Sequence, residues 1–196
     1  MEYTGGRLHI PTISTLESVQ LIKQAKKKGL QVSCSVSINN LTLTDKVLES
    51  FDTNYKLMPP LRTPQDIKAL KKALTDGTID MVTSDHNPID IENKKIEFDH
   101  AKYGSIGLES CFGALQKVTN LETAIQALTQ QSVFNISQSS VAQGQKANIT
   151  LFDPILKWEF EKEHIISSSK NAAFLGQPLL GRAYGIINNS QVLLHE

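Results

Sequence analysis

The chain has 196 residues, of which 40% are hydrophobic and 20% charged, a composition typical of a folded globular protein. Twenty Lys and Arg residues balance twenty Asp and Glu residues, so the charge gives no reason to expect binding to nucleic acid or to a membrane surface. No run of about 18 apolar residues predicts a membrane helix. Two cysteines are too few for a disulfide framework and favour a reducing, cytoplasmic location.

Strands and helices alternate from the beginning of the chain. The pattern predicts an extended run over residues 7–13, then a helix that starts at the capping box Ser14-Thr15-Leu16-Glu17 and stops at Gly29. Apolar and polar residues alternate over 30–37, which predicts a strand. Cys34 belongs to the apolar set of that strand and is predicted to pack in the core.

The same alternation of strands and helices continues to about residue 128. The tail differs, because it is predicted to form strands with no helix of comparable strength between them. The later elements are a helix from Thr63-Pro64 to Asp76-Gly77, a strand over 79–83, helices over 108–118 and 121–128 with Asn120 as cap, and tail strands over 147–152 and 185–194 that turn at Asn188-Asn189. Alternating strands and helices imply parallel strands joined by right-handed crossovers, in an open sheet or a closed barrel. No glycine-rich phosphate loop follows a strand, which argues against a nucleotide-binding sheet.

Two positions, Asp85 and His9, carry side chains of the types used in catalysis and metal binding. Asp85 follows the strand over 79–83, and the carboxyl ends of parallel strands are where reactive side chains gather. An aspartate there can bind a metal, act as a general base or cap a turn, and the local sequence leaves these alternatives open. His9, on the first strand, can be a ligand or a histidine whose hydrogen bonds are satisfied in the core.

Several ordered motifs resemble the second half of a dihydroorotase. They are His9-Ile10-Pro11-Thr12-Ile13-Ser14-Thr15, Tyr55-Lys56-Leu57-Met58-Pro59-Pro60-Leu61-Arg62, Asp76-Gly77-Thr78-Ile79-Asp80, Ser84-Asp85-His86-Asn87-Pro88, Tyr103-Gly104-Ser105-Ile106-Gly107-Leu108-Glu109, Ser169-Lys170-Asn171 and the run 174–181. The resemblance covers nearly the whole chain and weakens between about 116 and 143. It is specific because the motifs occur in the same order at compatible spacing.

The resemblance implies an α/β fold. Dihydroorotases are amidohydrolases with a distorted (β/α)8 barrel and a small β-sandwich, and they interconvert carbamoyl-aspartate and dihydroorotate in pyrimidine synthesis. Residues 1–143 would form strands six to eight of the barrel with their helices, and 144–196 the C-terminal strands of the sandwich. Active members are expected to hold zinc. Asp85 falls on the family's catalytic, metal-site aspartate, although it would meet a metal only if the rest of the barrel supplied the other ligands.

The functional positions depart from the family pattern. Thr12 stands in place of a metal-ligand histidine, Asn39 and Asn40 replace a His-His pair, Met58 replaces a substrate-contacting asparagine, and Ile89 replaces the second histidine of the last motif. Asp85 and His86 are retained. His86, Gly104 and Gly107 are the remaining candidates for substrate binding. Four departures in one pocket, on a scaffold whose motifs persist, indicate that the shape was kept and the chemistry lost.

Two functions follow from the resemblance. The favoured one is a catalytically inactive, structural homologue that assembles with aspartate carbamoyltransferase; the alternative is a piece of an active dihydroorotase or a related cyclic-amide hydrolase. We expect no cofactor on this chain, because one plausible ligand cannot make a catalytic zinc site. A closed barrel takes about 250 residues, so we also expect three strand-helix units to self-associate.

Overall fold

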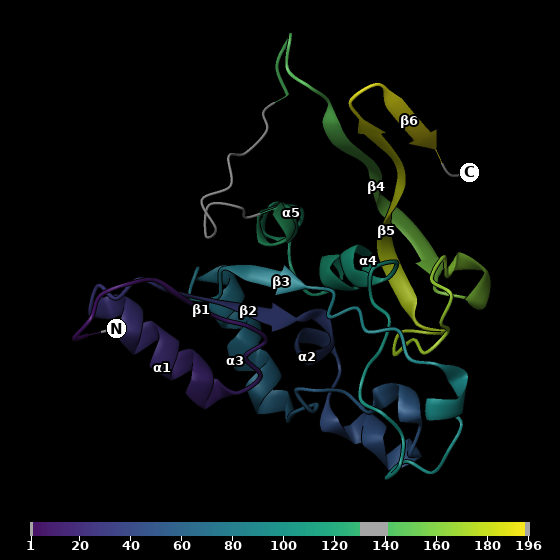
Figure 1. The fold of residues 1–196 in the computed structure, drawn as a ribbon, viewed down its shortest axis with the longest axis horizontal. Helices are drawn as coiled ribbons and strands as arrows, with labels where there is room; N and C mark the ends of the chain where they lie inside the picture. The colour runs from purple at the N-terminus through teal and green to yellow at the C-terminus, as the bar shows by residue number, and fades with distance from the viewer. Residues whose placement is uncertain (1, 130–140, 195–196) are drawn as a thin grey trace.

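The computed structural model describes residues 2–129 and 141–194, which form two three-stranded sheets (Figure 1). The first sheet is parallel and consists of β1 (Leu8–Ile10), β2 (Val32–Ser37) and β3 (Met81–Thr83) in that order. Its register places Ile10 opposite Cys34 and Val36 opposite Val82. The predicted alternation of parallel strands with helices is therefore confirmed, with strands shorter than the apolar runs suggested.

Two amphipathic helices pack beside each other against this sheet. Helices α1 (Leu16–Lys27) and α3 (Pro64–Thr75) bury their apolar stripes in a core that includes Cys34 and Val36, both fully buried. Both helices stop at a glycine with positive φ, Gly29 and Gly77, as predicted. Cys34 is a core residue, and burial raises the pKa of its thiol to about 11.

The predicted capping box at Ser14 and Glu17 is wrong. Thr15 is the N-cap of α1, and its hydroxyl accepts a hydrogen bond from the backbone N–H of Ser18 at 3.1 Å. The Ser14 hydroxyl instead accepts a bond from Arg62, at 3.3 Å. The Asp66 carboxylate, from the beginning of α3, accepts the backbone N–H of Leu16, the first residue of the helix, at 2.9 Å.

Of the two helices predicted after residue 100, the first is shorter than predicted and the second agrees with the prediction to within one residue. After α2 (Ile38–Thr42) and the 3₁₀ turns at Asp45–Ser50, Thr53–Tyr55 and Ile91–Asn93 come α4 (Cys111–Gln116) and α5 (Leu121–Thr129). The prediction of a helix over 108–118 is too long, because α4 covers only Cys111–Gln116 and residues 108–110 form a turn. Asn120 caps α5 as predicted, accepting from Thr123 at 2.8 Å.

The second sheet is antiparallel and lies beyond α4 (Figure 1). It consists of β4 (Asn148–Glu159), β5 (Pro178–Asn188) and β6 (Gln191–Leu194), joined by a short 3₁₀ turn at Lys162–His164 and by a turn at Asn189. The predicted turn at Asn188-Asn189 is confirmed, and both long strands exceed their predicted lengths. The proposed boundary between 143 and 144 stays a prediction. Within residues 2–129 and 141–194, no helix is long and apolar enough to span a bilayer.

Candidate functional site

Asp85 and His86, the residues that match the family pattern, lie at the carboxyl edge of the parallel sheet. β1, β2 and β3 run in the same direction, so the residues that follow them meet at one edge. Thr12 follows β1, Asn39 follows β2 and Asp85 follows β3. The structure thus brings three of the predicted site positions to the same edge, and their chemistry depends on what each side chain contacts.

Asp85 is half-buried and held by the scaffold. Its backbone is in the left-handed region at φ 49°, which costs energy for a residue with a side chain. Burial raises the pKa of its carboxyl, and a hydrogen bond from the Ser37 side chain acts in the opposite direction. Ser37 also accepts a bond from the backbone N–H of Asn39 at 3.2 Å. Sequence reasoning missed Ser37, which looked like an ordinary polar residue at a strand end.

Two serine hydroxyls lie within hydrogen-bond distance of the His9 ring. Its Nδ1 lies 2.9 Å from the Ser33 hydroxyl and its Nε2 lies 3.4 Å from the Ser35 hydroxyl. Ser35 also accepts the backbone N–H of Thr12 at 3.2 Å, and Thr12 has φ 47°. This geometry favours the interpretation of His9 as a histidine with satisfied hydrogen bonds, and it fixes Thr12 through its backbone.

The substituted positions 39, 40, 58 and 89 differ in burial and in hydrogen bonding. Asn40 is buried and donates to the Pro60 carbonyl at 3.0 Å, whereas the Asn39 amide is buried with no hydrogen-bond partner among the described residues. Met58 is 58% exposed. Ile89 contributes its backbone, whose N–H donates to the side chain of Asn171 and whose carbonyl accepts from the Ser169 hydroxyl. No imidazole stands at positions 39, 40 and 89, and no amide at position 58, where the family pattern has them.

His86, Gly104 and Gly107 each make close contacts with neighbouring residues. The Nδ1 atom of His86 accepts from the backbone N–H of Gly107 at 3.2 Å and of Leu108 at 3.3 Å, so this nitrogen carries no proton. A Cβ on Gly107 would collide with the Ser84 carbonyl, and one on Gly104, at φ 138°, would collide with Asn87. The geometry gives both glycines a steric reason to be glycine, and their substrate role stays a prediction.

Asn171 fastens the loop that follows Asp85. Its Oδ1 accepts from the Ile89 backbone, and its Nδ2 donates to the carbonyls of Asn87 and Gly104, both at 3.1 Å. The side chain is almost completely buried. The sequence placed Asn171 only in a motif of resemblance, because hydrogen bonds to residues 67 to 84 positions away leave no local signal.

Two buried lysines hold the chain between residues 91 and 104. Lys94 donates to the Thr53 carbonyl at 2.7 Å, while the Thr53 hydroxyl donates to the Lys94 carbonyl. Lys56 donates to the carbonyls of Phe98 and Asp99 and lies over the Tyr103 ring, 5.0 Å from its centroid. Burial lowers the pKa of Lys94 to about 8, since no carboxylate within ion-pair distance compensates for its lost hydration in the described part of the chain.

The lowered pKa of Lys94 predicts a gain of stability as the pH rises. Between pH 8 and its ordinary pKa of 10.5, the unfolded state binds more protons than the folded state, so the free energy of unfolding increases. We expect about 1.4 kcal/mol per pH unit at most from this group. Urea denaturation at pH 8, 9 and 10 should show a more positive slope in the natural chain than in Lys94→Met.

The exposed neighbour Lys95 provides the matched control, and Lys95→Met should keep the slope. The raised pKa values of Cys34 and Cys111, about 11 and 12, act in the opposite direction above pH 9, but equally in all three proteins. Identical slopes in the natural chain and Lys94→Met would contradict the assignment.

The donor set at the sheet edge does not fit a catalytic zinc ion. Such a site needs three protein ligands, and His, Cys and carboxylate side chains are preferred. Thr12 offers a hydroxyl, Asp85 one carboxyl group, and no group of three or more His, Cys, Asp or Glu side chains is placed to hold a metal within residues 2–129 and 141–194. Metal chemistry on this chain alone is therefore unsupported by its residues.

Comparison with curated proteins finds several dihydroorotases. No family model matches the chain. The dihydroorotase of Endomicrobium trichonymphae is 39% identical over 191 residues, which cover 93% of this chain and 45% of the relative. The dihydroorotases of Geotalea daltonii and Elusimicrobium minutum are 36% and 38% identical, with 47% and 43% of each relative covered. The chain spans about half the length of the curated relatives it matches.

Solved structures agree on the fold. An L-hydantoinase (dihydropyrimidinase) from Arthrobacter aurescens superposes with a TM-score of 0.86 at 22% identity, covering 99% of this chain and 46% of that one. The inactive dihydroorotase-like domain of a Chaetomium thermophilum CAD-like multifunctional protein gives 0.69 at 21% identity, covering 95% and 50%. The expected partial amidohydrolase fold is consistent with both. In sequence, the chain is similar over nearly its whole length to dihydroorotases, of which it spans about half the length.

Proposed function

We propose that the chain is the C-terminal part of a dihydroorotase-like protein that keeps the amidohydrolase scaffold and has lost catalysis. The observation that carries this proposal is Thr12, fixed at the end of β1 by its backbone bond to Ser35 and offering a hydroxyl where the family pattern has a histidine. A hydroxyl is a poor ligand for zinc. Among the described residues, no group of three or more His, Cys, Asp or Glu side chains is placed to hold a metal ion.

The retained residues support a scaffold role. Asp85 is hydrogen-bonded to Ser37, and His86 accepts two backbone N–H groups through Nδ1. Both interactions stabilise the turn from β3 into the following loop. A motif whose side chains bind the backbone and a neighbouring strand can be maintained for shape after its chemistry is lost. In this proposal β1, β2 and β3 correspond to barrel strands six to eight, followed by the sandwich strands.

The proposed role is structural, in a cytoplasmic protein of pyrimidine synthesis, with aspartate carbamoyltransferase as the partner. An inactive dihydroorotase-like domain occurs in the CAD-like multifunctional protein to which this chain is similar in fold, which supports a retained non-catalytic use of the scaffold. Self-association of the isolated chain is the second proposed interaction, because the edges of the parallel sheet at β1 and β3 have no further strand among the described residues.

The alternative is a piece of an active dihydroorotase. The raised pKa of Asp85 favours it, because a half-buried carboxyl at a strand end is suited to proton transfer. The two candidates differ in the other half of the protein. An active enzyme needs a His-x-His pair and a bridging ligand there, and a scaffold does not.

Zinc binding and turnover test the proposal. We expect calorimetry with Zn²⁺ to show no stoichiometric binding at low micromolar Kd, and the protein that contains this chain to hydrolyse dihydroorotate at the background rate. The Endomicrobium trichonymphae dihydroorotase serves as the positive control in both assays. Stoichiometric zinc binding that is lost in Asp85→Ala, or turnover clearly above background in the unmodified protein, would establish the alternative.

A further inference from the structure

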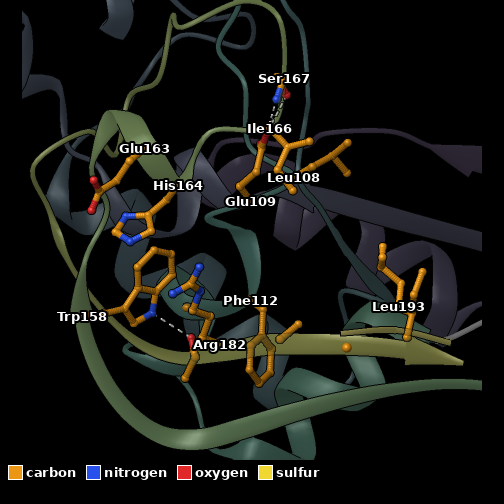
Figure 2. Close-up of a pocket in the computed structure, with 15 residues that line it drawn as sticks. Leu108, Glu109, Phe112, Trp158, Glu163, His164, Ile166, Ser167, Arg182 and Leu193 are labelled. Carbon is orange, nitrogen blue, oxygen red and sulfur yellow. Dashed lines mark hydrogen bonds between the residues drawn. The ribbon is translucent and has the colours of Figure 1, made fainter. Parts of the chain in front are cut away.

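We draw no further inference here: the strongest candidate, the apolar surface patch where the 70% exposed Phe51 meets the edge of the Phe98 ring, has nothing in the structure to show what covers it, and a cover for the apolar groove between α4 and the antiparallel sheet (Figure 2) restates an established property of the fold.

Discussion

Asn171→Ala should lower the free energy of unfolding by about 3–4 kcal/mol. The substitution removes one buried side chain that accepts from Ile89 and donates to the carbonyls of Asn87 and Gly104. Each lost bond costs about 1 kcal/mol, and the abandoned buried backbone groups add a penalty because water cannot reach them freely. Urea denaturation followed by circular dichroism measures the loss.

Asn87→Ala is the matched control for this prediction. Asn87 is exposed, lies in the same loop, and its side chain makes one long bond of 3.4 Å to the Tyr103 carbonyl. We expect a loss below about 1 kcal/mol. Asn171→Asp should cost at least as much as Asn171→Ala, since it keeps the acceptor for Ile89 but places a buried carboxylate oxygen against the carbonyls of Asn87 and Gly104. A similar loss for Asn171→Ala and Asn87→Ala would show that the hub does not hold the loop.

Phe160→Ala should cost about 3–5 kcal/mol. Phe160 is fully buried, where its ring packs edge-on against Trp158 at 5.8 Å and is stacked with His164 at 6.5 Å. Truncation removes this apolar area and leaves a cavity at the end of β4 that the surrounding strands cannot close.

Phe51→Ala provides the comparison, because Phe51 is 70% exposed and touches only the edge of Phe98 among the aromatic residues described. We expect a change below about 1 kcal/mol for it. Thermal or urea unfolding of the three proteins under the same conditions decides between them. A loss below about 1 kcal/mol for Phe160→Ala would mean that the C-terminal sheet unfolds separately from the part that the experiment monitors.

The sequence predicted the elements whose signals are local. The stops at Gly29 and Gly77, the start at Thr63-Pro64 and the cap at Asn120 depend on backbone conformation and on donors a few residues away. It failed where a distant residue takes over a local role. Arg62 engages the Ser14 hydroxyl that the predicted capping box needed, and Asp66 accepts the backbone N–H of Leu16.

The candidate site was predictable in position but not in its interactions. Thr12, Asn39 and Asp85 do lie at one edge, since parallel strands present their ends together. The partners Ser37 for Asp85 and Asn171 for the following loop were missed. A serine and an asparagine carry no functional signature in a sequence, and only the fold places them against the motif. The roles of the substituted positions stay predictions until zinc binding and turnover are measured.

The long separation between Asn171 and its partners has a consequence for the order of folding. The bonds from Asn171 to Asn87 and Ile89 close loops of 84 and 82 residues, and such closure costs chain entropy before any contact compensates for it. Local helices such as α1 and α3 can form early, whereas the loop carrying Asp85 and His86 must wait for the C-terminal segment. During synthesis on the ribosome, the retained motif would therefore reach its final shape only after residue 171 has emerged.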